Sequence, residues 1–300
     1  MDAAAIESIH ADARHLVDLD TRYGGDDVSR LAVRVFRAAY QRLAGGLYVP
    51  VVERDLQAAV GELGQVSAWI TYDADQKSLS RQLVNEAILV SRLANDRRTE
   101  LFELAQLAMQ SVHLGRSREA LQVADGVIDS SPAAPRVTAV FHIRKARALA
   151  QTGQRAQALS EHDLAASILA DGITNRDPDW TWWLDDSELA WHRAMSLASL
   201  GEWSAALDLF HQAWTLRPRH AHRARYNDLV HVLEAQVAGG AWADAQASLA
   251  AVIADAPDIN SSRTTSLLRR VSNQIMQTAN TPSTLTDTAR ELQQRLEVSA

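Results

Sequence analysis

The stretch LGRSREAL, residues 114–121, recurs along the chain in three related forms. These are TGQRAQAL (152–159), LGEWSAAL (200–207) and GGAWADAQ (239–246), and their aligned glycines are spaced by 38, 48 and 39 residues. Each glycine follows one long helical pattern and precedes a second, alanine-rich pattern. Glycine readily adopts the left-handed conformation that often ends a helix. The repeating unit is therefore predicted to be a helix, a glycine turn and a second helix.

Small residues flank each turn at fixed positions. Three units have a pair of alanines 12 residues apart: Ala108 and Ala120, Ala146 and Ala158, and Ala194 and Ala206. A small side chain at both places lets the two helices of a unit approach closely. Trp203 and Trp242 stand at the start of a second helix, and we expect them to pack over this contact rather than to bind a ligand.

The rest of the chain continues the helical pattern and contains no convincing strand. Helices are predicted at 26–43, 50–70 and 77–94, and a last pair within 262–297 that breaks at 280–283. Polar terminal units are expected where a stack of repeats meets water. This predicts three parts: an N-terminal helical region (1–98), the repeats (99–260) and C-terminal capping helices (261–300).

The small-residue and glycine skeleton resembles tetratricopeptide repeats, although these units are longer than the ~34 residues of that repeat. The resemblance implies an all-α fold of tetratricopeptide-like helical hairpins, stacked as a right-handed α-solenoid with a concave groove.

Composition excludes several classes of function. The chain has 300 residues, no cysteine and a formal net charge of −7. The lack of cysteine removes disulfides and thiolate chemistry, and the negative charge argues against nucleic acid as a partner. We expect a cytoplasmic protein, because no apolar run is long enough for a membrane helix and the start does not read as a signal peptide. In the most basic window, RPRHAHRAR (217–225), a solvated turn is favoured over an acceptor for an anionic ligand.

A second resemblance is carried by four longer segments: DLDTRYGGDDVSRLAVRVF (18–36), VGELGQVSAWITYDADQ (60–76), AMQSVHLGRSREAL (108–121) and DPDWTWWLDDSELAWH (177–192). Together they look like the sensor region of actinobacterial helix-turn-helix regulators of the XRE type. This implies sensing of a small molecule, peptide or protein, with output on genes for development or specialised metabolism. Only 17 residues, not basic, precede the first segment, so we expect no direct DNA binding.

Aligning the units on their alanines predicts which side chains line the groove. The positions just before and after each alanine give an apolar and aromatic surface with a few polar points, which suits a peptide, a small metabolite or a protein. For Trp191 the groove and the core are equally good interpretations, and for Met109 and Met195 the core is favoured. With Trp183 from the tryptophan-rich stretch, the predicted groove residues are Phe102, Met109, His113, Arg147, Gln151, Trp183, Glu188, Trp191 and Met195.

The stretch at 177–192 is also the best place to look for chemistry. A helix entered with Asp179 or Thr181 as its cap would put Asp185, Glu188 and His192 on one face. Such a set could hold a divalent metal or act as acid and base. No metal-site signature accompanies it, so no metal or other cofactor is expected, and the catalytic residues of any enzyme are unknown.

The sequence thus favours a ligand- or protein-binding sensor or adaptor in transcriptional regulation. Two alternatives stay open. One is an enzyme of specialised metabolism on the same scaffold, with Asp185, Glu188, His192 or His113 as acid-base groups. The other is a scaffold for homodimerisation.

Overall fold

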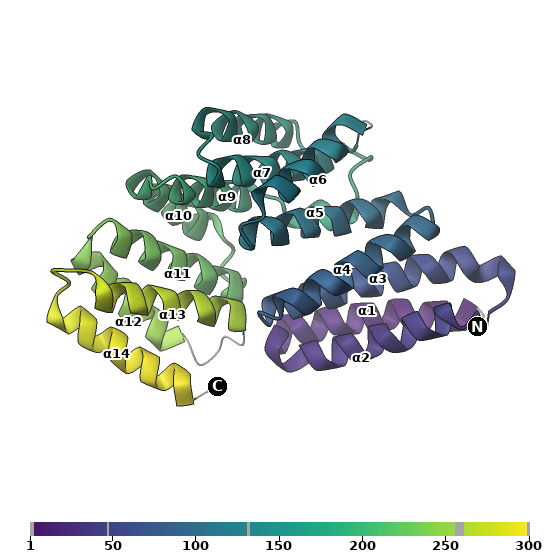
Figure 1. The fold of residues 1–300 in the computed structure, drawn as a ribbon, viewed down its shortest axis with the longest axis horizontal. Helices are drawn as coiled ribbons and strands as arrows, with labels where there is room; N and C mark the ends of the chain where they lie inside the picture. Colours follow the sequence, from purple (N-terminus) through teal and green to yellow (C-terminus); the bar gives the residue numbers. More distant parts are fainter. Residues whose placement is uncertain (1–2, 47, 131–132, 256–260, 299–300) are drawn as a thin grey trace. The chain divides into compact units, whose positions relative to one another are not determined.

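The chain is built from α-helices throughout its described part (Figure 1). The computed structural model describes residues 3–46, 48–130, 133–255 and 261–298. Within these ranges there are α-helices and two short 3-10 helices, and no strand. The predicted all-α fold is therefore confirmed. The N-terminal helices are α1 (Ala3–Tyr23), α2 (Gly25–Ala44), α3 (Glu53–Asp73), α4 (Lys77–Leu93), α5 (Arg97–His113) and α6 (Ser117–Ser130), with the 3-10 helix η1 (Pro50–Val52) before α3.

The remaining helices carry the rest of the repeat. They are α7 (Pro135–Gln151), α8 (Arg155–Ala170), η2 (Asp179–Trp183), α9 (Asp186–Ser199), α10 (Trp203–Leu216), α11 (His222–Ala238), α12 (Trp242–Asp255), α13 (Ser262–Gln277) and α14 (Ser283–Val298). Their bounds agree with the predicted hairpins to within a few residues, except at the start of α9.

Two compact units make up the chain. Unit 1 comprises Met1–Pro132 with Asn260–Arg263, and unit 2 comprises Ala133–Ile259 with Thr264–Ala300. The three-part division drawn from sequence stays a prediction, and its boundary after residue 260 lies outside the described residues.

The predicted turns and close contacts are confirmed. Gly115, Gly153, Gly201 and Gly240 have φ of 69°, 76°, 79° and 72°, the left-handed region that glycine enters without a steric penalty. All six alanines of the predicted pairs are fully buried. The helices of a hairpin thus meet through small side chains on both sides of the turn.

Unit 1 continues the same hairpin without glycine. Asp75, with φ of 57°, ends the turn between α3 and α4, and Asn95, with φ of 54°, does so between α4 and α5. Around Asp75 the small positions are Ala68 and Ser80, both fully buried, and the Ser80 hydroxyl donates to the Ala68 carbonyl at 2.5 Å. Asp and Asn tolerate the left-handed conformation better than other non-glycine residues. Asp75 therefore takes the place of the repeat glycine within a hairpin, and Asn95 ends the last helix before the next hairpin begins.

Each unit has its own apolar core. In unit 1, helices α1 to α4 form a core that includes large side chains such as Phe36, Leu56 and Leu63. Gly64 lets Phe36 and Ala87 approach α3 closely. In unit 2, one cluster surrounds Phe210 and another joins α11 and α12 to α13 and α14. Trp203 packs on the first of these clusters and Trp242 on the second, as predicted.

A search of the described residues finds no helix that is both long and apolar enough to cross a membrane.

Candidate functional site

The helix that carries Glu188 and His192 begins later than the sequence predicted. Residues 179–183 form the 3-10 helix η2, and α9 starts only at Asp186. The cap is Asp185, not Asp179 or Thr181: its Oδ1 accepts the backbone N–H of Glu188 at 2.9 Å and the Ser187 hydroxyl at 2.5 Å. The physical reason is Leu184, which is extended and fully buried and so holds the chain out of helical conformation before the cap.

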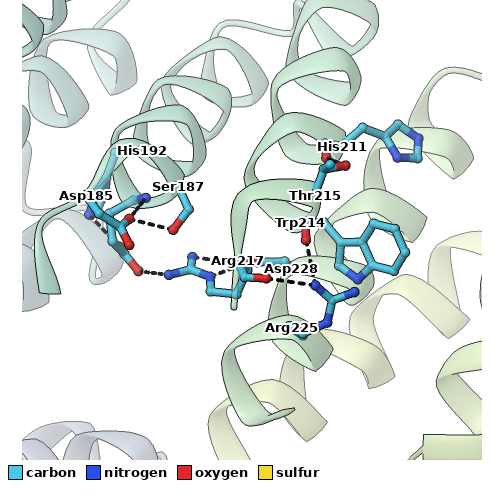
Figure 2. A network of polar contacts seen from close by, with 10 residues as sticks. Asp185, Ser187, His192, His211, Trp214, Thr215, Arg217, Arg225 and Asp228 are labelled. Carbon is cyan, nitrogen blue, oxygen red and sulfur yellow. Dashed lines mark hydrogen bonds and ion pairs between the residues drawn. The ribbon is translucent and has the colours of Figure 1, made fainter. Parts of the chain in front are cut away.

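Buried arginines and acids hold together the helices of unit 2 (Figure 2). Arg217, at the end of α10, donates from Nε to Asp228 of α11 at 2.9 Å and from Nη1 to Glu188 of α9 at 2.6 Å. Asp228 is 1% exposed and Arg217 is 9% exposed. Burial raises the pKa of Asp228, and the charge of Arg217 works against that rise. Arg217 thus links three helices through charge-assisted hydrogen bonds.

Arg225 fixes the turn that brings Arg217 into place. Its Nη1 donates to the carbonyls of Trp214 at 2.9 Å and of Arg217 at 3.0 Å, and its guanidinium lies 4.6 Å from the Trp214 ring (Figure 2). Arg219 and His220 from the same basic window are exposed. In this basic window, Arg217 and Arg225 therefore stabilise the fold, whereas Arg219 and His220 face solvent.

His192 lies between two buried arginines of α7. Nη1 of Arg144 is 3.2 Å from its Nε2, and Nη1 of Arg147 is 3.2 Å from its Nδ1. All three side chains are at most 5% exposed. A neutral imidazole accepts at one ring nitrogen only. One of these two contacts therefore sets a donor against a donor, and an acceptor lies close by, because Oε2 of Glu188 is 3.7 Å from the same Nε2.

Aromatic rings enclose this cluster. The Arg147 guanidinium lies 5.6 Å from the Trp191 ring and that of Arg144 lies 5.8 Å from Trp183. Trp191 also forms edge-to-face pairs with His192 and His231, with ring centroids 4.8 and 5.4 Å apart. Its indole Nε1 is buried and has no hydrogen-bond partner among the described residues. The cluster therefore presents several N–H donors among aromatic faces.

The three residues considered as metal ligands, Asp185, Glu188 and His192, do not form a metal site. The Asp185 carboxylate caps α9 through its Oδ1. Glu188 and His192 do lie near each other, with Oε2 3.7 Å from Nε2, but Glu188 is paired with Arg217 and His192 also contacts the arginines of α7. Among the described residues no group of three or more His, Cys, Asp or Glu side chains is placed to hold a metal ion.

The predicted groove residues of unit 2 fall into two groups. Arg147, Trp183, Glu188 and Trp191 lie in or beside the arginine and histidine cluster. Gln151 is exposed at the end of α7, and Met195 packs against the core cluster around Phe210.

The three predicted residues of unit 1 share the helix α5. Phe102, Met109 and His113 are all partly buried. His113 is hydrogen-bonded to the Tyr72 hydroxyl through Nδ1, and the two rings stack at 5.6 Å. Their role as groove residues remains a proposal.

Sequence reasoning missed Arg144 and His231, and it considered His192 only for metal or acid-base chemistry. A signal was present. Each of these three residues lies nine positions before a repeat glycine. The groove alignment did not include this position, which in the first repeat is Gln106, 4% exposed. The position thus holds a buried polar side chain in four consecutive repeats.

A comparison with solved structures bears on the class of fold. No protein family matches the sequence, and no curated protein matches it either. Among solved structures, the chain is similar to a Rap protein crystallised in complex with competence and sporulation factor, with a TM-score of 0.58 and 10% sequence identity. The match covers 97% of this chain and 88% of the other. It supports a tetratricopeptide-like helical-repeat fold.

Proposed function

We propose that this chain is a tetratricopeptide-like sensor or adaptor that binds a peptide, protein segment or metabolite at the cluster of α7, α9 and α11. The ligand would carry an acceptor group, such as a carboxylate, beside an apolar body. In line with the resemblance to XRE-type regulators, the output would be transcriptional control of development or specialised metabolism.

The observation that carries this proposal is the arrangement around His192. Buried guanidinium groups are desolvated, so they interact strongly with an anion placed beside them. Here Arg144 and Arg147 meet at the His192 imidazole, and Arg147 also lies over the Trp191 ring, whose indole Nε1 is buried and without a partner among the described residues. A ligand carboxylate that reached these side chains would accept from several donors at once.

The neighbouring groups suit the same ligand. Arg217 is paired with Glu188 and Asp228, which offsets part of their negative charge and weakens their repulsion of an anion. The faces of Trp183 and Trp191 offer apolar contact for the body of a peptide or metabolite. The fold is also compatible with binding such a partner, since the similar Rap protein was crystallised in complex with competence and sporulation factor.

A thermal-shift screen tests the proposal. The probes are a library of carboxylate-bearing metabolites and short peptides with free or amidated C-termini. We expect a subset of acidic probes to stabilise the wild type, and the same subset to have no effect on Arg147→Met. The same substitution at the exposed Arg155, which pairs with Glu202, serves as the matched control and should keep the shifts. If no probe stabilises the wild type, or if Arg147→Met keeps every shift, the proposal is wrong.

A further inference from the structure

One tryptophan of unit 2 faces water instead of the cluster described above. Trp182, in the 3-10 helix η2, is 80% exposed, and Ile173 earlier in the same loop is 76% exposed. Trp183, Trp191 and Trp214 each have an arginine guanidinium over the ring. No such cation lies over Trp182 among the described residues. Tryptophan is enriched among the residues that dominate the binding energy of protein interfaces.

The loop that carries Trp182 is held firmly in place. Asp177 accepts the backbone N–H groups of Arg136 and Thr174, both at 2.8 Å. The buried Arg136 side chain donates in turn to the carbonyls of Thr181, at 3.2 Å, and of Leu184. These bonds fix both ends of η2. A partner that binds Trp182 therefore meets a preorganised surface and does not bear the entropy cost of ordering a loop.

The surface around Trp182 is acidic. In a 3-10 helix the side chains at i and i+3 eclipse one another, so Asp179 and Trp182 share one face of η2. The Asp179 carboxylate is exposed and makes no hydrogen bond or ion pair with any described residue. Asp171, Asp185 and Asp186 are exposed on the flanking segments, against one exposed arginine, Arg176.

We infer that the face of η2 formed by Asp179 and Trp182 is a second binding site, which takes an arginine side chain from a segment of a partner protein. A guanidinium is planar, stacks on an indole face and forms charge-assisted hydrogen bonds with a carboxylate. Asp179 and Trp182 supply these two complementary groups side by side, and the acidic flanks favour a basic segment around the arginine. Neither of these two side chains belongs to the cluster around His192, although the neighbouring Trp183 of η2 does.

The experiment uses the full chain labelled with 5-fluorotryptophan and fluorine NMR, with the Trp182 signal assigned by its loss in Trp182→Phe. The probe is an acetylated, amidated peptide with three spaced arginines. Matched peptides carry citrulline, which keeps the shape without the charge, or lysine, which keeps the charge without the planar fork. We expect the arginine peptide to shift the Trp182 signal, the lysine peptide to shift it less and the citrulline peptide to leave it unchanged. Asp179→Asn should weaken binding roughly fivefold.

Trp69 of unit 1, which is 39% exposed, is the internal control, and its signal should not move. Equal shifts with arginine and citrulline peptides, an unchanged affinity in Asp179→Asn, or no shift at millimolar peptide would each overturn the inference. A Trp182 signal that changes with protein concentration alone, together with dimers in sedimentation, would also overturn it, because a second copy would then occupy the surface.

Discussion

Two glutamates three residues apart on α5 respond to their surroundings in opposite ways. Glu103 is fully buried, accepts the Ser91 hydroxyl at 2.8 Å, and has one carboxylate oxygen without a partner among the described residues. Burial raises the pKa of Glu103 to about 9. Burial acts on Glu100 as well, but hydrogen bonds from Arg92 and Arg97 outweigh it and leave the pKa of that carboxyl lowered.

Glu103→Gln should therefore stabilise the protein at neutral pH. The folded state keeps the proton of Glu103 up to a pKa of about 9, whereas the unfolded state releases it near 4.5. Between these values the stability of the wild type falls as pH rises, by about 1.4 kcal/mol per unit for this one group. The glutamine variant lacks this contribution, so its advantage should grow with pH. Urea unfolding at several pH values measures it.

Glu100→Gln is the control with the opposite sign. The lowered pKa of Glu100 contributes stability that is present above 4.5 and is lost as pH falls through the folded pKa. That variant should therefore be less stable than the wild type at neutral pH. Equal pH dependence in Glu103→Gln and the wild type would contradict the buried, protonated state of Glu103.

The Arg217 network makes a second prediction at this scale. Asp228→Asn keeps the shape of the side chain but removes the charge that faces Arg217 in a site only 1% exposed. Removing one partner of a buried ion pair costs about 3–5 kcal/mol when the other charge is left uncompensated, and here the loss should lie near the lower end because Glu188 still faces Arg217. Chemical denaturation of this variant and of the exposed-pair control Arg155→Met should show a large loss in the first and little change in the second. Similar stabilities would mean that the Arg217 pair does not hold the helices together.

At the scale of helices and turns, replacing two different glycines by alanine should change the stability in opposite directions. Gly153 ends the turn after α7 with φ of 76°, and a Cβ there meets open space. Gly126 lies inside α6, also with open space around it. Gly153→Ala should lose about 1–2 kcal/mol through the left-handed backbone, and Gly126→Ala should gain about 0.5–1 kcal/mol through helix propensity. Thermal unfolding measures both, and a stabilising Gly153→Ala would contradict the turn.

Some helices and turns could be predicted from sequence and others could not. Helix pairs whose turn contains glycine were predictable, because glycine and two small residues at fixed distances mark both the turn and the contact. The turn at Asp75 uses another residue in the left-handed region, so 50–70 and 77–94 were predicted as a helix pair but were not aligned with the repeat. The start of α9 was misplaced because Leu184 is buried by tertiary packing, which local capping signals do not reveal.

At the scale of the whole molecule, the fold was more predictable than the site. Hairpin packing repeats along the chain and so leaves a periodic pattern. The candidate site depends on side chains from α7, α9, α10 and α11 that meet only after folding. Arg147, Glu188 and Trp191 were predicted because they follow the repeat alignment. Arg217 was considered only as part of the basic window 217–225, for which a solvated turn was favoured, and Asp228 was missed because it lies outside that alignment.

The central claim is that the cluster around His192 binds a ligand with an acceptor group. Its most direct test is calorimetric titration of a probe that stabilises the wild type into the wild type, Arg147→Met and Arg155→Met, with circular dichroism to verify that each variant is folded. Loss of one charge-assisted contact of about 1.5–3 kcal/mol should weaken binding to Arg147→Met by roughly tenfold to a hundredfold. Arg155→Met should bind like the wild type. Equal affinity for all three proteins would contradict the claim.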